Sequence, residues 1–208
     1  MKRSAVVLAG GSSSRIGVDK GIMELAGKPL LGHVIDAIRD SVEEIIVVTN
    51  SQDRISKYSC LGFGHVRFAV DRSNIQSPLI GALSGFNVAK GDYCLLVPFD
   101  TPFISKQVVS LLFELCLGKA AAIPKWPNGN IEPLHAVYRT TVAKESAETA
   151  VSEGRLDMRG MIEKMRGVRY VSTLVLQQLD PAHKTFFNIN TQADFQTATK
   201  MAKKPKMG

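Results

Sequence analysis

Residues 5–20 read AVVLAGGSSSRIGVDK, an apolar run followed by two glycines, three serines, an arginine and a lysine. The run at 5–9 is short and rich in valine and alanine, which is typical of a buried strand. Gly10 and Gly11 follow it at once, and glycine lets the backbone adopt unusual angles and approach an anion closely. Successive backbone N–H groups in such a loop can bind phosphate. The stretch therefore predicts a buried first strand with an anion-binding loop at its carboxyl end.

The same pattern continues downstream, where short β-branched runs alternate with segments of helical period. The sequence predicts further strands at 45–49, 66–71, 93–98 and 120–124, and helices at 31–40, 52–58, 79–89 and 105–117. Such alternation indicates βαβ units. We therefore expect an α/β fold, a mostly parallel, Rossmann-like twisted sheet with helices on both faces.

From residue 130 onward the rhythm changes. The sequence predicts an extended segment at 131–138, helices near 141–153 and 157–166, a strand at 168–172 and a last helix at 191–202 with Thr191 as its N-cap. No internal repeat or low-complexity linker divides the chain before the final lysines. We therefore expect one domain over residues 1–208.

Composition and charge narrow the class of protein. The 208 residues are 45% hydrophobic and 22% charged, which fits a globular chain with a buried core. Four of the seven net positive charges belong to the lysines at 200, 203, 204 and 206, which leaves +3 for the rest. We expect residues 200–208 to form a basic, solvated tail, and the modest remaining excess to favour small polyanionic substrates such as nucleotides.

Several partner classes are disfavoured. Aromatic residues make up 7% of the chain and are not interleaved with basic ones, which argues against an RNA-binding module. Cys60, Cys94 and Cys116 form no C-x-x-C pair, so buried free thiols are expected rather than disulfides or a zinc site. The apolar run at 5–9 is too short for the core of a signal peptide, and no stretch approaches membrane-spanning length. We expect a cytoplasmic protein without nucleic-acid or membrane partners.

The glycine-rich stretch is not one of the common nucleotide fingerprints. Its spacing fits neither G-x-x-x-x-G-K-[ST] nor G-x-G-x-x-G. The serines at 12–14 add hydroxyl donors, Arg15 offers a bidentate fork and Lys20 a compact positive charge. A tight turn between strand and helix is the alternative interpretation of the glycine pair.

The stretch resembles the opening signature of the nucleotidyltransferase family that includes the molybdenum cofactor guanylyltransferases. The resemblance rests on LAGG at 8–11, RIG at 15–17, DK at 19–20 and GKPL at 27–30, and it extends over residues 5–195. It implies that the glycine loop wraps a nucleoside triphosphate and that a lysine contacts its phosphates. The residues so assigned are Leu8, Ala9, Gly10, Gly11 and Lys20. Cytidylyl relatives typically carry alanine for the first glycine, so the glycine pair implies guanine.

Carboxylates follow two of the predicted strands. Asp100, in LLVPFDTPF, ends a buried strand and suits a hard cation with oxygen ligands such as Mg²⁺. The alternative is a helix cap, but Ser105 is better placed for that role. The family resemblance implies that D-x-P-F is a metal-binding motif, so we expect Asp100, together with Asp71, to bind Mg²⁺.

Other strand-end residues gain a role only from the resemblance. Asp71 and Asn50 by themselves are typical turn residues. The resemblance places both at the nucleotide site, together with Gly81 of the segment SPLIG at 77–81. Ser77 stands where the family has glycine, which puts a close backbone contact there in doubt.

The segment FFNINTQADF carries the expected acceptor side. Asn188 and Asn190 project from one face if the backbone is extended, and two amides can bind a polar heterocycle. Turn residues before a Thr-capped helix are the alternative. The resemblance links N-[IV]-N-T to the pterin substrate.

Three further residues are candidates that the sequence disfavours. His135, in EPLHAVYR, could be a general base, but a lone histidine in an apolar run is more often structural. Arg155 and Arg159 could bind a substrate phosphate, but a solvated helix face is the safer interpretation.

The resemblance implies a reaction in which the terminal phosphate of molybdopterin attacks the α-phosphorus of GTP and expels pyrophosphate. Mg²⁺ on Asp100 and Asp71, with Lys20 and Arg15, would neutralise the charge. Candidate protein partners are other molybdenum cofactor biosynthesis proteins or the enzymes that accept the cofactor. The alternatives are cytidylyl transfer to a pterin, transfer to cobinamide phosphate or a sugar phosphate, and a non-catalytic nucleotide-binding regulator.

Overall fold

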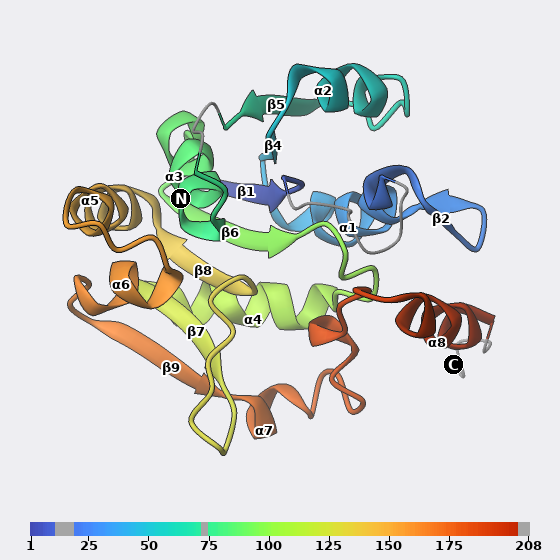
Figure 1. The fold of residues 1–208 in the computed structure, drawn as a ribbon. Coiled ribbons are helices and arrows are strands. Elements are labelled where there is room, and N and C mark those ends of the chain that lie inside the picture. Colours follow the sequence, from blue (N-terminus) through green and yellow to red (C-terminus); the bar gives the residue numbers. More distant parts are fainter. Residues whose placement is uncertain (11–18, 72–74, 204–208) are drawn as a thin grey trace.

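A computed structural model describes residues 1–10, 19–71 and 75–203. Across these residues, the central sheet has seven strands in the order β5-β4-β1-β6-β8-β7-β9 (Figure 1). Its strands are β1 (Arg3–Leu8), β4 (Glu44–Thr49), β5 (Val66–Val70), β6 (Tyr93–Pro98), β7 (Ala121–Lys125), β8 (Ala136–Arg139) and β9 (Val168–Ser172). A separate two-stranded hairpin pairs β2 (Glu24–Leu25) with β3 (Lys28–Pro29).

The middle of the sheet is parallel. Strand β1 pairs in parallel with β4 on one side and β6 on the other, with Val6 opposite both Ile46 and Leu96. Among the described strands of this sheet, β8 alone runs antiparallel to its neighbours, β6 and β7. The predicted α/β class with a mostly parallel sheet is therefore confirmed.

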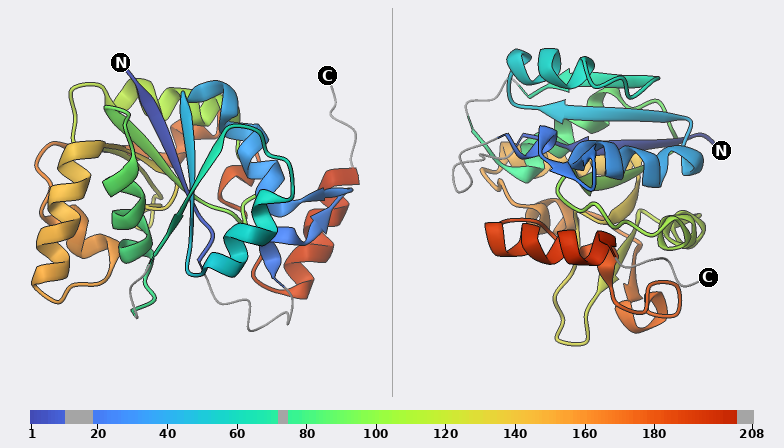
Figure 2. Two further views of the ribbon diagram at one scale, coloured as in Figure 1. Left: turned by 90° about the horizontal axis from the view of Figure 1, so that it is seen from above. Right: turned by 90° about the vertical axis from the view of Figure 1, so that its right-hand side faces the viewer.

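Helices cover both faces of the sheet because successive strand side chains point to opposite sides. Ala5 and Val7 pack with α1 and α4, whereas Val6 packs with α3, α5 and α6. Figure 2 shows α3 and α5 on one side of the strands and α1 on the other. The described helices are α1 (Leu30–Ile38), α2 (Gln52–Ser59), α3 (Pro78–Val88), α4 (Lys106–Cys116), α5 (Thr140–Ser152), α6 (Met158–Glu163), α7 (Thr173–Leu176) and α8 (Gln192–Lys203).

The second half of the chain departs from the predicted boundaries. The extended segment at 131–138 is wrong over its middle, because a turn in which the His135 N–H donates to the Glu132 carbonyl precedes β8. The helix predicted at 157–166 shortens to α6. The β2–β3 hairpin and α7 were not predicted, since two-residue strands and a four-residue helix are too short to show a period.

A small apolar cluster brings the C-terminal segment to the hairpin. Leu25 and Leu30 pack with Ile189 and Ala198, so α8 lies beside β2 (Figure 1). Helix α8 begins after Thr191, whose Oγ1 accepts from the Asp194 N–H at 3.1 Å, as predicted for its N-cap. Residues from both ends of the chain therefore meet beyond the carboxyl end of β1.

Two compositional predictions need correction. The basic tail does not start at Lys200, because α8 continues to Lys203; Lys204 and Lys206 lie outside the described residues. The three cysteines are free thiols, but Cys60 is exposed rather than buried. Within 1–10, 19–71 and 75–203, no helix combines the length and apolar character needed to cross a bilayer. The cytoplasmic location and the single domain stay predictions.

Candidate active site

A cavity of about 330 Å³ opens at the carboxyl ends of β1, β4 and β6, in the size range of small-molecule sites. Its lining residues are Leu8, Gly10, Val48, Thr49, Asn50, Asp71, Gln76, Ser77, Pro78, Gly81, Pro98, Phe99, Asp100 and Leu134. Six residues predicted for the nucleotide or its metal ion are in this set: Leu8, Gly10, Asn50, Asp71, Gly81 and Asp100. Gly11 and Arg15, also predicted, lie outside the described residues. Gln76 and Leu134 were not anticipated.

The parallel register explains why these residues meet. The ladder continues past the strand ends, where the Phe99 N–H donates to the Leu8 carbonyl at 3.1 Å and the Asp71 N–H donates to the Thr49 carbonyl at 2.7 Å. Polar side chains that follow each strand are thus held at the same edge of the sheet. This edge is where open α/β sheets bind ligands.

The first turn after β1 differs from the prediction at two residues, Ala9 and Gly10. Ala9 is fully buried and does not line the cavity; its N–H donates to the Val48 carbonyl at 2.8 Å. Gly10 does not have a left-handed φ, so the expectation of an unusual backbone angle is wrong at this residue. A Cβ there would make only ordinary contact, 3.6 Å from the Asn50 nitrogen. Because Gly10 lines the cavity, a side chain there would occupy space in it.

Helix α3 forms the opposite wall, and Ser77 is its N-cap. The φ of Ser77 is −143°, which any residue can adopt, and its Oγ accepts from the Ile80 N–H at 3.2 Å as the helix N-cap. Gly81 and Gly85 let α3 lie close to β1: a Cβ at Gly81 would be 3.3 Å from Leu8, and one at Gly85 would be 2.4 Å from Val6.

Asp100 is a desolvated carboxylate at the rim of this cavity. Burial raises its pKa, and the positive charge of Lys20 opposes that rise. The alternative role as a helix cap is excluded, since Ser105 caps α4 through a hydrogen bond from the Val108 N–H. A carboxylate in this environment is stabilised by a nearby cation.

Asp71 and Asp100 carry the kind of oxygen donor that Mg²⁺ prefers, and they follow β5 and β6, which β4 and β1 separate in the sheet. Asp71 and Asp100 both line the cavity and offer oxygen ligands. In the part of the chain that the structure describes, no group of three or more His, Cys, Asp or Glu side chains could hold a metal by itself. Mg²⁺ commonly uses one or two carboxylates and completes its octahedron with water and substrate phosphates.

Lys20 lies beside Asp100 and is only 8% exposed. It begins a 3₁₀ turn, Lys20–Ile22, and its Nζ donates to the Ile189 carbonyl at 3.1 Å. The Ile189 N–H in turn donates to the Asp100 carbonyl at 3.0 Å. Two residues predicted as catalytic are therefore joined through one backbone unit from the far end of the sequence.

That backbone unit carries the predicted acceptor residues on either side. Ile189 is fully buried in the cluster with Leu25 and Leu30, whereas Asn188 and Asn190 are exposed. The alternation places both amides on the solvent side of Ile189, as expected for an extended segment. They flank the point where Lys20 and Asp100 are linked.

Two residues of α2 next to this site were missed by the sequence reasoning. Arg54 pairs with the carboxylate of Asp19 and donates to the Ala9 carbonyl, while Tyr58 donates to the same carboxylate at 2.8 Å. The one available signal was spacing: Arg54 and Tyr58 are four residues apart and share a face of a polar helix.

The disfavoured candidates lie outside the cavity. His135 is 3% exposed, neither ring nitrogen has a hydrogen-bond partner within the described chain, and the ring packs edge-on against Phe186 with centroids 5.4 Å apart. Burial lowers its pKa to about 3. The histidine is therefore neutral at pH 7 and sits in aromatic packing, as the structural interpretation predicts.

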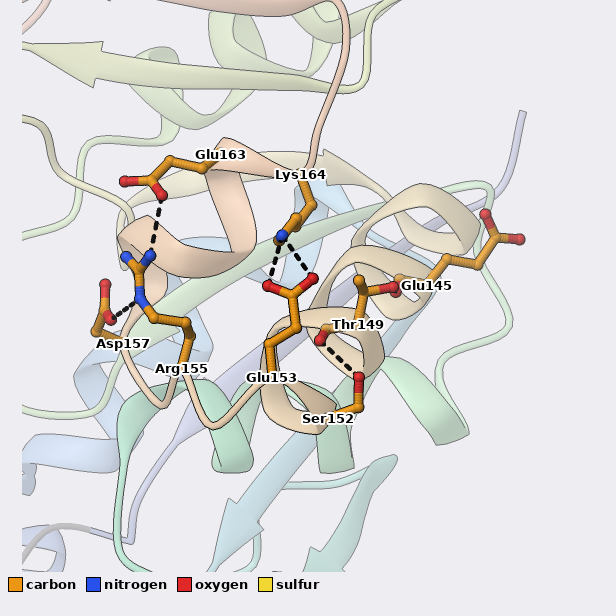
Figure 3. A network of polar contacts seen from close by, with 8 residues as sticks. All are labelled: Glu145, Thr149, Ser152, Glu153, Arg155, Asp157, Glu163 and Lys164. Atoms are coloured by element: carbon orange, nitrogen blue, oxygen red, sulfur yellow. Dashed lines mark hydrogen bonds and ion pairs between the residues drawn. The ribbon is translucent and has the colours of Figure 1, made fainter.

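The two arginines are likewise separate from the cavity. Figure 3 shows Arg155 between Asp157 and Glu163, at 3.3 Å and 3.1 Å, where α5 leads into α6. Arg159 lines a different hollow, with Lys125 and Tyr170. Neither lines the cavity that contains Asp100.

Comparison with known proteins agrees with this geometry. The sequence model described as MobA-like NTP transferase domain matches residues 5–168. A probable molybdenum cofactor guanylyltransferase of Methanosarcina mazei is 32% identical over 206 residues, which cover 97% of this chain and 92% of the relative. Another, of Thermococcus gammatolerans, is 33% identical and covers 90% of this chain and 94% of the relative.

A solved structure agrees as well. Molybdopterin-guanine dinucleotide biosynthesis protein A from Archaeoglobus fulgidus superposes with a TM-score of 0.81 at 26% identity, over 96% of this chain and 98% of that one. The family match covers more than half of the chain, from β1 to the start of β9. The chain belongs to the family of MobA-like NTP transferase domains.

Proposed function

We propose that this protein transfers GMP from GTP to the terminal phosphate of molybdopterin, releases pyrophosphate and forms the guanine dinucleotide cofactor. The observation that carries the proposal is that six of the residues predicted for the nucleotide or its metal ion line one cavity. The positive charge of Lys20 acts on the Asp100 carboxylate at its rim. The names of the relatives from Methanosarcina mazei and Thermococcus gammatolerans support the same activity.

The nucleophile needs no dedicated base in this reaction. The second pKa of a phosphate monoester is about 6, so the attacking phosphate is ionised at neutral pH. The protein must instead align two anions that repel one another and neutralise charge on the leaving pyrophosphate. A buried, uncharged His135 away from the cavity agrees with this requirement.

The roles follow from position around the cavity. Leu8 and Gly10 would approach the nucleotide from the end of β1, and Asn50, Asp71 and Gly81 would form the walls around it. Lys20 would donate from its Nζ to the phosphates, held in place by the Ile189 carbonyl. Asn188 and Asn190 would bind the pterin on the solvent side. Arg15 completes the proposed set.

Asp100 and Asp71 would hold Mg²⁺ as part of this proposal. When bound there, Mg²⁺ supplies positive charge that offsets the negative charge on the triphosphate. The chain's own contribution is to keep two oxygen donors at one rim and to place Lys20 near enough to act on Asp100.

Calorimetric titration tests the proposal directly. GTP, CTP and ATP are each titrated with Mg²⁺, with and without molybdopterin, and pyrophosphate release is followed in parallel. We expect GTP to bind most tightly and pyrophosphate to appear only with the pterin. Preferred use of CTP, or of cobinamide phosphate or a sugar phosphate as acceptor, would replace the proposal by a related transfer. No affinity for any triphosphate would overturn it altogether.

A further inference from the structure

We infer that Arg54, supported by Tyr58, is a positioning residue that fixes Lys20 for the triphosphate by clasping the two flanks of the glycine-rich stretch. The inference rests on the proposed function for the role of Lys20. Both residues lie on α2, outside the motifs that mark the family resemblance.

The contacts of Arg54 connect two segments that are ten residues apart in sequence. Its Nη1 donates to the Ala9 carbonyl at 3.0 Å, just after β1. Its Nε lies 3.4 Å from Oδ2 of Asp19, the residue before Lys20. One planar guanidinium thus binds the residues on both sides of 10–18, and its fork geometry suits two acceptors at once.

Asp19 passes this constraint to the turn that carries Lys20. Its Oδ1 accepts from the Gly21 N–H at 3.0 Å and so caps the 3₁₀ turn, and it also accepts from the Tyr58 hydroxyl at 2.8 Å. Gly21 lies directly against Tyr58, because a Cβ on Gly21 would be 2.3 Å from the phenol oxygen. The backbone on both sides of Lys20 is therefore fixed by α2.

The network is buried enough for these contacts to matter. The side chains of Arg54 and Asp19 are 15% and 13% exposed, and Tyr58 is fully buried. Burial, followed by the nearby Asp19 carboxylate, strongly raises the pKa of Tyr58, so its hydroxyl stays protonated and donates. Removing one partner leaves a poorly solvated charge, which is costlier than losing a surface pair.

A double-mutant cycle tests whether Arg54 acts through Lys20. Arg54→Ala is expected to lower kcat by roughly 10- to 100-fold, the order expected when a reacting group is displaced slightly. Arg54→Lys keeps the charge without the fork and should recover only part of the loss. In the Lys20→Ala background, Arg54→Ala should add less than about twofold. Fully additive losses would overturn the inference.

The matched control is Lys57→Ala, which removes an exposed cation from the same helix and should leave kcat unchanged. Tyr58→Phe removes only the hydroxyl, so it serves if Arg54→Ala does not fold. We expect a smaller loss of kcat, again absent in the Lys20→Ala background. An effect of Lys57→Ala equal to that of Arg54→Ala would overturn the inference, because loss of any positive charge on α2 would then explain the lower kcat.

Amide hydrogen exchange at Gly21 separates this inference from the proposed function. The Gly21 N–H is bonded to Asp19, so it should exchange slowly in the wild type and faster in Arg54→Ala. A wild type that transfers no nucleotide would end the proposed function. The exchange result would still test the clasp, which consists of the contacts of Arg54 with Ala9 and Asp19. Faster exchange supports the clasp, and unchanged exchange overturns it.

Discussion

The rim around Lys20 and Asp100 and the corner between α5 and α6 hold positive charge in opposite ways. Lys20 is 8% exposed, and its charge acts on the desolvated carboxylate of Asp100. The Arg155 side chain is 43% exposed and lies between two carboxylates of its own corner (Figure 3). In the sequence both were candidate phosphate ligands.

The difference lies in solvation. Water and salt screen the charges at the α5–α6 corner, so ion pairs there contribute little to stability or to binding. At the rim, burial weakens that screening, so each charge interacts more strongly with its neighbours and with a bound anion. The comparison indicates that burial of a cationic side chain is a better sign of an anion-binding role than its residue type is.

The largest expected effect comes from removing the cation at the rim. Lys20→Ala should lower the turnover of GMP transfer by roughly 10²-fold or more, because it deletes a preorganised donor to the phosphates. Steady-state kinetics measures this. Lys164→Ala, which removes an ammonium paired with Glu153 at the corner, is the control and should leave turnover unchanged. Near-normal turnover in Lys20→Ala would remove the distinction between the two regions.

The carboxylate at the rim should matter nearly as much. Asp100→Asn keeps the shape but removes the negative charge, so we expect turnover to fall by roughly 10- to 100-fold and the Mg²⁺ concentration for half-maximal rate to rise. Chelation of divalent ions should abolish transfer by the wild type. An unaltered Mg²⁺ requirement in Asp100→Asn would place the metal elsewhere.

Substitutions at Gly85 and Gly10 distinguish a glycine that is needed for packing from one that lines the cavity. A Cβ at Gly85 would lie 2.4 Å from Val6, so Gly85→Ala should lower the free energy of unfolding by about 1 to 3 kcal/mol. Gly10→Ala meets only ordinary contacts and should keep its stability while losing affinity for GTP. Denaturant unfolding and calorimetry measure the two effects. Loss of stability in Gly10→Ala would mean that Gly10 is needed for the fold.

The sequence predicted the residues at the rim better than the contacts that hold them in place. Asp100 could be assigned because it follows a buried hydrophobic strand, whereas Asp71, at the end of β5, gained its role only from the family resemblance. The contact between Arg54 and Asp19 joins residues 35 apart in sequence, and the helical period at 52–58 predicts the helix but not which residue Arg54 meets. Likewise β8, inserted antiparallel between β6 and β7, follows from packing that no local pattern reveals.

Acid should destabilise the fold through His135. Burial holds the pKa of His135 at about 3, below its ordinary value near 6.5, although the Glu132 carboxylate lies 3.9 Å from the ring Nδ1. Between pH 6.5 and pH 3, the His135 imidazole therefore binds a proton in the unfolded state but not in the folded state. Stability should therefore fall by about 2 kcal/mol from pH 7 to pH 5.

Denaturant unfolding at several pH values measures this slope. His135→Phe should flatten it, whereas His65→Asn, a change at an exposed histidine, should keep it. An equal slope in His135→Phe and wild type would mean that other groups cause the acid sensitivity.

The smallest effect is expected at the α5–α6 corner. Arg155→Ala removes the hydrogen bonds to Glu163 and Asp157 that raise the pKa of the guanidinium, but both carboxylates remain solvated. The thermal midpoint should fall only slightly, and less still in high salt, because screening already weakens the pairs. GTP affinity and turnover should match the wild type. A clear loss of GTP affinity in Arg155→Ala would show instead that this solvated cation reaches the substrate, and the contrast between rim and corner would no longer hold.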